Sequence, residues 1–127
     1  MVTEFGVPSL YFGVNEPVDP RNLSDLEKKH IPVINAPQRV AKNEYFDVQV
    51  EVGSVIEHPN EYGHFIMSID LYAGESFLAQ ASLTPVQTAA KATFTIKLQN
   101  PASELVAYAM CNLHGRWVGR KEIAVDD

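Results

Sequence analysis

Alternation of apolar and polar residues constrains the fold of this chain more than any other feature. In residues 46–52, FDVQVEV, every second side chain is apolar, and polar side chains lie between them. Successive side chains of a strand point to opposite faces of a sheet, so this spacing predicts a strand with one buried face and one face in water. Similar segments lie at 64–72, 76–83, 92–98, 104–110 and 117–125, and the apolar run 31–34 is expected to form the first strand.

The same alternation predicts which side chains of each strand are buried. In two segments it places the following residues on the core face: Phe65, Met67, Ile69 and Leu71 in 64–72, and Phe77, Ala79, Ala81 and Leu83 in 76–83. In 104–110 the apolar face continues to Cys111. A buried free thiol is therefore the simplest interpretation of this cysteine taken alone.

Turn-forming residues separate the predicted strands. Gly74, Pro85, the pair Asn100-Pro101 and Gly115 lie between them, and these are residue types that tight turns favour. About seven short strands with short connections are typical of an antiparallel β-sandwich of the immunoglobulin-like kind, so we predict an all-β fold. The one helix that the sequence indicates is 23–29, where Ser24 can cap a single turn.

The length of the chain, 127 residues, suits one domain with a substantial core. We expect residues 1–127 to form this single domain. Residues 1–22 are rich in proline and polar groups but carry Phe5, Leu10, Tyr11 and Phe12. We expect this N-terminal extension to pack against the body of the domain or against a neighbouring subunit.

Composition excludes several classes of protein. The formal net charge of −6 argues against a general nucleic-acid or anionic-membrane binder. One cysteine cannot form an intrachain disulfide or a four-cysteine metal module. The N-terminus lacks the basic start and apolar run of a signal peptide, and no apolar stretch approaches the ~20 residues that cross a bilayer. We expect a cytoplasmic protein.

The four histidines and the cysteine all fall at predicted strand ends or in loops. His30 precedes the first strand, His58 and His64 enclose a loop of five residues, and His114 follows Cys111 by three positions. A lone histidine is more often a hydrogen-bonded structural residue than a ligand. However, loops on a rigid sandwich commonly carry binding groups, and a tight loop with a thiolate and an imidazole brings two ligands to one ion. The joint pattern favours a metal site.

The number of available ligands indicates which metal. Zinc prefers four ligands in a tetrahedron, and structural zinc usually takes more thiolates than this chain offers. Four imidazoles and one thiolate suggest a square pyramid, with the imidazoles around the base, the sulfur beneath and one position open. An open position on a redox metal is a catalytic arrangement, and electron donation from an axial thiolate favours ferrous iron as a reductant.

Four motifs resemble those of the superoxide reductases, the family of neelaredoxin and the desulfoferrodoxin catalytic domain: KHIPVI at 29–34, FDVQVEVG at 46–53, HPNEYGH at 58–64 and CNLHG at 111–115. The resemblance runs from about Lys28 to Glu122. It implies an immunoglobulin-like sandwich with one mononuclear iron, which cycles between Fe²⁺ and Fe³⁺. The implied ligands are His30, His58, His64, His114 and, as the axial ligand, Cys111.

The resemblance also implies an activity and partners. Members of the family reduce superoxide to hydrogen peroxide with one electron, commonly from rubredoxin, and the one-domain class implies a homotetramer. The desulfoferrodoxin branch adds an N-terminal iron domain held by four cysteines. This chain has only Cys111, so it resembles the one-iron class.

Lys29, next to His30, is the expected catalytic residue besides the ligands. Its charge can attract a small anion, since Coulomb attraction over ~4 Å is about 4 kcal/mol at an effective dielectric of ~20. It can also hold a water that supplies a proton. The alternative is a solvated surface lysine. Lys28, Arg116, Arg120 and Lys121 also lie close in sequence to His30 or His114, and we expect them to add positive charge if these segments converge.

One departure from the family motif concerns the sixth iron position. The family usually has Glu-Lys-His before the proline, and the glutamate caps oxidised iron. This chain reads Glu27-Lys28-Lys29-His30, so Lys28 stands where that glutamate is expected. In an extended segment a one-residue shift turns a side chain to the opposite face. We expect water, hydroxide or a mobile surrogate such as Glu27 at this position.

Three other functions fit part of the pattern. A blue-copper electron carrier is also a β-sandwich with a cysteine and a histidine on a late loop, but it uses two histidines and normally a weak methionine, and no methionine follows His114. A non-enzymatic binding module would only present loops to a protein partner. A superoxide dismutase would also oxidise superoxide and would therefore evolve dioxygen without a reductant.

Overall fold

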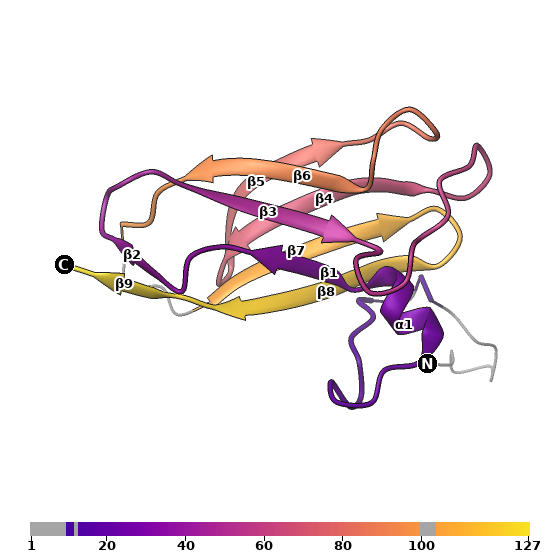
Figure 1. The fold of residues 1–127 in the computed structure, drawn as a ribbon, viewed down its shortest axis with the longest axis horizontal. Coiled ribbons are helices and arrows are strands. Elements are labelled where there is room, and N and C mark those ends of the chain that lie inside the picture. The colour runs from indigo at the N-terminus through magenta and orange to yellow at the C-terminus, as the bar shows by residue number, and fades with distance from the viewer. Residues whose placement is uncertain (1–9, 12, 100–103) are drawn as a thin grey trace.

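The computed structural model describes residues 10–11, 13–99 and 104–127 (Figure 1). Within these ranges it contains one short helix and nine strands. They are α1 (Asp25–His30), β1 (Pro32–Asn35), β2 (Arg39–Ala41), β3 (Phe46–Val52), β4 (Ile66–Ala73), β5 (Ser76–Ser82), β6 (Lys91–Ile96), β7 (Glu104–Cys111), β8 (Gly115–Glu122) and β9 (Ala124–Asp126). The predicted all-β fold is confirmed.

Two antiparallel sheets form the two layers of the fold. One has the strand order β1-β3-β6, and the other has the order β5-β4-β7-β8. Their inner faces share one apolar core, to which β3 contributes Val48 and Val50, β4 contributes Ile69 and Leu71, and β7 contributes Leu105, Ala107 and Ala109. The seven strands of these sheets are the predicted ones. The additional strands β2 and β9 form a short parallel pair at the end of the molecule opposite α1 (Figure 1).

The predicted buried faces of two strands are partly wrong. Met67 is 43% exposed and Ile66 is buried instead, because the pairing of β4 with β7 shifts register between Ile66 and Ser68. Phe77 is 58% exposed, and Leu78 contacts the core in its place, because the pairing of β4 with β5 shifts between Leu71 and Tyr72. An irregularity of this kind sends the following side chains to the opposite face, which strict alternation cannot predict.

Helix α1 confirms the helix predicted at 23–29 with Ser24 as its cap, so the segment before His30 is helical and not extended. Ser24 accepts a hydrogen bond from the Glu27 N–H, and the Glu27 side chain accepts one from the Ser24 N–H, which together form a capping box. The helix continues through His30 and ends at Ile31, which precedes Pro32 and adopts the extended conformation that a proline imposes on the residue before it. Glu27 and His30 are therefore three positions apart on a helix, which is less than one turn.

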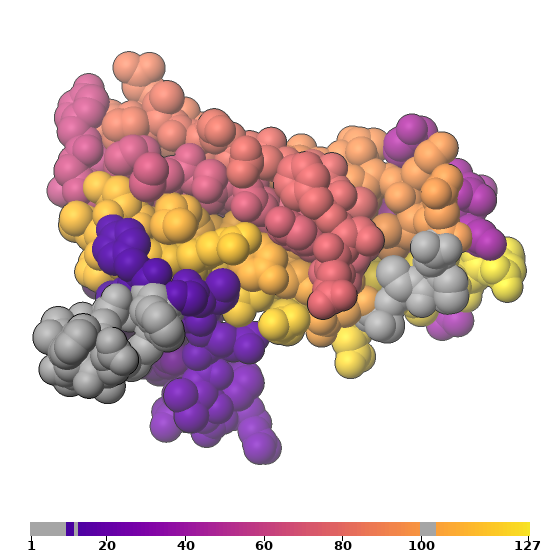
Figure 2. Space-filling model, turned by 180° about the vertical axis from the view of Figure 1, so that it is seen from behind, coloured from indigo at the N-terminus to yellow at the C-terminus, as the bar shows by residue number. Residues whose placement is uncertain are grey.

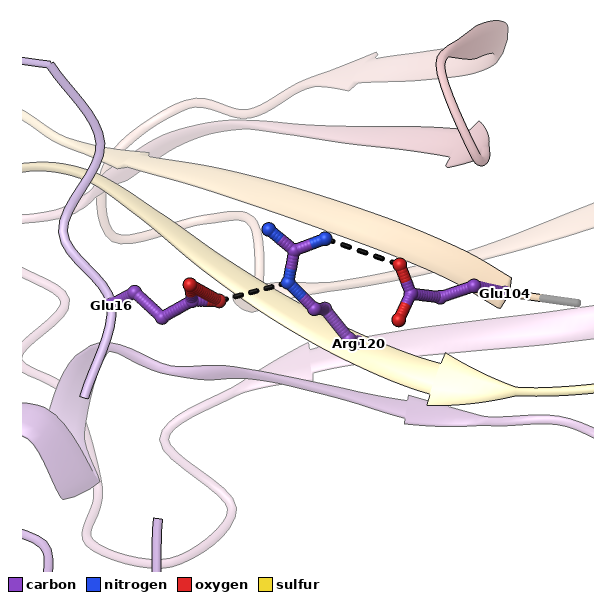
Figure 3. Close-up of polar contacts among 3 residues, drawn as sticks. All are labelled: Glu16, Glu104 and Arg120. Atoms are coloured by element: carbon purple, nitrogen blue, oxygen red, sulfur yellow. Dashed lines mark hydrogen bonds and ion pairs between the residues drawn. The ribbon is translucent and has the colours of Figure 1, made fainter. Parts of the chain in front are cut away.

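The described part of the N-terminal extension runs along β8. The backbone N–H of Asn15 donates to the Arg116 carbonyl at 2.8 Å, and the Val118 N–H donates to the Asn15 carbonyl at 3.1 Å. Figure 2 shows this indigo segment against the yellow C-terminal strands. Arg120 of β8 donates to Glu16 at 2.8 Å and to Glu104 of β7 at 3.1 Å, so one guanidinium ties the extension to two strands (Figure 3).

Several expectations concern residues outside the described ranges. They are the contacts expected of Phe5 and Phe12 and the turn expected at Asn100-Pro101. Within the described ranges, no helix has the length and apolar character needed to cross a bilayer.

Candidate metal centre

The five predicted ligand residues all lie at the end of the sandwich that carries α1. His30 is the last residue of α1, Cys111 is the last residue of β7, and His114 lies in the turn between β7 and β8. His58 and His64 lie in the connection from β3 to β4. These elements meet at the right-hand end of Figure 1, so the fold brings together residues that are more than 80 positions apart in the sequence, as His30 and His114 are.

The four imidazoles form a closed ring. Neighbouring ring centroids are 4.7 Å apart for His30 and His58, 4.8 Å for His58 and His64, 5.0 Å for His64 and His114, and 4.9 Å for His114 and His30. Adjacent rings are inclined to one another by 62° to 84°. The four distances between neighbouring centroids are similar, which indicates that the four rings surround one centre.

Backbone carbonyls orient two of these rings. The Nδ1–H of His30 donates to the Leu26 carbonyl at 2.7 Å, and the Nδ1–H of His58 donates to the Pro59 carbonyl at 2.6 Å. Each contact fixes the tautomer and leaves the Nε2 lone pair free, as is usual for metal-ligating histidines. The two Nε2 atoms accordingly face one another at 3.2 Å.

The thiol lies beside the imidazole ring system. The Sγ atom of Cys111 is 3.4 Å from Nε2 of His58 and 3.7 Å from Nδ1 of His114. One potential ligand atom each from His30, His58, His64 and Cys111 lies within 4.8 Å of the others. His114 stands outside that tight group but contacts the sulfur.

His64 provides the test of whether these residues fit a metal ion. Its Nε2 is buried and has no hydrogen-bond partner among the described residues. A buried polar atom without a partner is costly, and native proteins rarely leave one. A cation at the centre of the ring would satisfy this nitrogen, and four imidazoles with one thiolate suit a transition metal. The donor set fits the mononuclear iron that the sequence predicts.

Burial sets the protonation of the cluster. It lowers the pKa of His30 from the ordinary 6.5 to about 4, and it also lowers the pKa of His58 and of His114. The imidazoles of these three residues are therefore neutral at pH 7, with lone pairs available. Burial raises the pKa of the Cys111 thiol, so binding of a metal must displace its proton.

Lys29 is the predicted cation that lies near the cluster. Its charge contributes, after burial and His64, to the lowered pKa of His58 and His114. Two of the other basic residues have acidic partners instead. Arg116 lies 3.7 Å from Asp70 and over the ring of Tyr108, and Arg120 pairs with Glu16 and Glu104. Fewer basic residues therefore add unpaired positive charge near the cluster than the sequence led us to expect.

Two glycines allow the ligand loops to approach the rest of the chain. Gly53 has a φ of +89°, and a Cβ there would lie 2.6 Å from the backbone nitrogen of His58. Gly115 has a φ of +81°, and a Cβ there would overlap the Leu10 carbonyl oxygen. Side chains other than glycine rarely adopt this backbone conformation, so both positions require glycine.

Sequence reasoning did not identify three residues that support the ligands. Trp117, which is buried, stacks on His30 with centroids 5.0 Å apart and donates its indole N–H to the His114 carbonyl at 2.9 Å. Asn15 donates from its side chain to the Arg116 carbonyl at 3.0 Å. Asn112 contacts both neighbours of His64. The only signal in the sequence was that Asn112 lies within the Cys111–Gly115 motif and that Trp117 follows it by two positions.

Comparisons with known proteins agree on one family. The family described as Desulfoferrodoxin matches residues 22–120. A protein of Methanocaldococcus jannaschii is 37% identical over 121 residues, which cover 91% of this chain and 97% of that one. The neelaredoxin of Megalodesulfovibrio gigas is 32% identical over 77% of this chain and 88% of its own length. The structure of the superoxide reductase (neelaredoxin) from Ignicoccus hospitalis is similar with a TM-score of 0.77, at 35% identity over 89% of this chain and 95% of that one.

Proposed function

We propose, since this chain belongs to the desulfoferrodoxin family, that its activity is the reduction of superoxide to hydrogen peroxide at one bound iron ion. The proposed ligands are His30, His58, His64, His114 and Cys111. The observation that carries this proposal is the closed ring of four imidazoles with the thiol beside it, together with the buried Nε2 of His64, which has no partner among the described residues. The chain is thus an oxidoreductase that acts on superoxide.

The reaction consumes one electron and two protons for each superoxide. Iron bound in the ring would supply the electron. The protein supplies the surroundings: burial keeps the imidazoles of His30 and His58 neutral, and the backbone carbonyls of Leu26 and Pro59 hold both rings in the ligating tautomer. Trp117 covers one face of His30 and limits the access of water from that side.

Lys29 is the residue that we propose to guide the substrate. It lies in the last turn of α1, directly before His30, and its charge reaches His58 and His114. Superoxide is a small anion, and a single nearby cation raises its local concentration. A water held by the Lys29 ammonium is the proposed source of one of the two protons.

Glu27 is not proposed as a ligand. Its carboxylate Oε1 accepts the Ser24 N–H at 2.8 Å, so the side chain already serves the helix N-terminus. Water or hydroxide from solvent is the proposed occupant of the remaining position at the metal. This agrees with the place of Lys28 where the family motif usually has the glutamate.

The other candidate functions account for less of the cluster. A copper carrier would use two histidines and leave His58 and His64 without a role, although both rings belong to the closed set. A binding module would not need a buried imidazole nitrogen without a partner.

Further expectations extend this proposal. The electron donor is a one-electron carrier such as rubredoxin, the assembly is a homotetramer, and residues 1–127 form one domain. A cytoplasmic location suits the chain, because a reducing compartment keeps the Cys111 thiol available to the metal.

The stoichiometry of turnover tests the activity. The iron-loaded, reduced protein is mixed anaerobically with superoxide, and hydrogen peroxide and dioxygen are both measured. We expect one peroxide for each superoxide consumed and no dioxygen. Dioxygen evolved without a reductant, at one molecule for every two of superoxide, would identify a dismutase and contradict the proposal.

A further inference from the structure

His64 differs from the other buried imidazoles in how its ring is held. The rings of His30 and His58 are each fixed by an Nδ1–H bond to a backbone carbonyl. Among the described residues, no hydrogen bond reaches either ring nitrogen of His64, and its Nε2 is buried without a partner. The direction of this imidazole therefore depends on its packing against His58 and His114 and on the backbone that carries it.

The side chain of Asn112 contacts the backbone on both sides of His64. Its Oδ1 accepts the N–H of Phe65 at 2.9 Å, and its Nδ2 donates to the carbonyl of Gly63, also at 2.9 Å. The backbone N–H of Asn112 donates to the Phe65 carbonyl at 3.2 Å. One residue thus holds the peptide groups that precede and follow His64.

These bonds connect the His64 segment to the sheet. His64 also exchanges backbone bonds with Glu61, at 2.9 Å and 3.1 Å, but Glu61 belongs to the same connection, so this pair shapes the loop without attaching it. Asn112 follows Cys111, whose backbone is paired in β7 with Ile66 of β4 and Gly115 of β8. The Asn112 amide therefore fixes His64 relative to the sulfur of Cys111.

We propose that Asn112 is a positioning residue for His64, acting through the backbone in place of the ring contact that His30 and His58 have. This inference rests on the proposed iron site. It assigns to the asparagine the role that carbonyl partners play for ligating histidines, which is to set the ring direction before the metal binds.

A double-mutant cycle on iron affinity tests the proposal. Fe²⁺ is titrated anaerobically into the metal-free protein in competition with a chelator. Asn112→Ala should weaken iron binding by about tenfold or more, the loss typical of removing the partner of a ligating histidine. In a His64→Ala background there is no ring left to position, so the same change should alter the affinity by less than about twofold.

The visible absorption and EPR spectra of the ferric protein give a second readout. Asn112→Ala should change both at saturating iron, whereas Asn35→Ala should change neither, because Asn35 is exposed on β1 and contacts Gln49. If Asn112→Ala does not fold by circular dichroism, Asn112→Asp replaces it in the cycle. That variant keeps the acceptor for Phe65 and loses the donor to Gly63, and we expect a smaller loss that again depends on His64.

Two results would overturn the role of Asn112: native iron affinity in the Asn112 variant, or an equal loss of affinity with and without His64. The second result would mean that Asn112 supports the fold and not the ligand. A native chain that binds no iron would contradict the proposed function itself, and the two failures are thereby distinguished.

Discussion

The carboxylate of Glu27 accepts a hydrogen bond from the backbone N–H of Ser24 at 2.8 Å, while the Ser24 hydroxyl accepts the N–H of Glu27 at 3.1 Å. This reciprocal pair begins the helix that ends at His30. Glu27, one of the expected alternatives for the sixth iron position, therefore contacts the N-terminal end of the helix whose last residue is His30.

Replacing Glu27 with alanine distinguishes its role in the helix cap from a role as an iron ligand. We expect the visible absorption of the ferric protein to remain unchanged, and the free energy of unfolding of the metal-free protein to fall by about 1 kcal/mol through loss of the cap. Ser24→Ala is the matched control, because it breaks the same box without touching a carboxylate. A large spectral shift in Glu27→Ala that Ser24→Ala does not share would show that Glu27 reaches the metal.

Gly53→Ala should disturb the site more than Gly74→Ala. Both glycines have positive φ values, +89° and +57°, so each substitution costs about 1–2 kcal/mol in backbone strain. A Cβ at Gly74 has no heavy atom within 4 Å, whereas one at Gly53 must displace the backbone of His58. We expect a larger loss of stability for Gly53→Ala in denaturant unfolding, together with weaker iron binding. Equal losses of stability in the two variants, with native iron affinity in both, would contradict the inference that a Cβ at Gly53 displaces the backbone of His58.

The metal-free protein should lose stability on acidification. Burial holds the pKa of His30 at about 4, below the ordinary 6.5, so between these values the unfolded chain binds more protons than the folded one. The free energy of unfolding must then rise with pH in this window, by up to about 1.4 kcal/mol per pH unit for one such histidine, and fall as the pH drops from 6.5 to 4. Urea unfolding at several pH values measures the slope. His30→Leu should make the slope less steep, since His58 and His114 still contribute, and a native chain with a flat profile from pH 6.5 to 5 would exclude buried neutral imidazoles.

Lys29→Gln should slow the reaction with superoxide. The charge of Lys29 reaches His58 and His114, and its removal should lower the second-order rate constant severalfold and reduce the dependence of that rate on ionic strength. Pulse radiolysis measures both quantities. Lys28→Gln, which removes the same charge one position earlier in α1, is the control. Equal slowing in the two variants would indicate that only net charge matters.

The strands could be predicted from the sequence because burial on one face imposes a period of two. In β7, the predicted residues Leu105, Ala107, Ala109 and Cys111 are all buried. The prediction failed at Met67 and Phe77, where register shifts in β4 pairing change the face that the side chains occupy. Such shifts depend on neighbouring strands, so a single strand's pattern does not contain them.

For the candidate site, the ligand residues could be predicted from the sequence, but the contacts that hold them could not. The types and spacing of His58, His64, Cys111 and His114 carried a chemical signal that could be read without a fold. The contacts that hold these residues could not be read in this way, since Trp117 reaches His30 only through the packing of β8 beside α1. The capped helix at 23–29 was predicted from Ser24, but the contact of the Glu27 carboxylate with the Ser24 N–H was not.

X-ray absorption at the iron edge tests the proposed centre most directly. We predict one iron per chain with one sulfur and several nitrogen scatterers in its first shell, and the loss of the sulfur contribution in Cys111→Ser. Because Cys111 is fully buried, the comparison of the native and Cys111→Ser edge spectra identifies the sulfur without a thiol reagent. Iron bound without a sulfur neighbour, with a spectrum that Cys111→Ser leaves unchanged, would contradict the proposed centre.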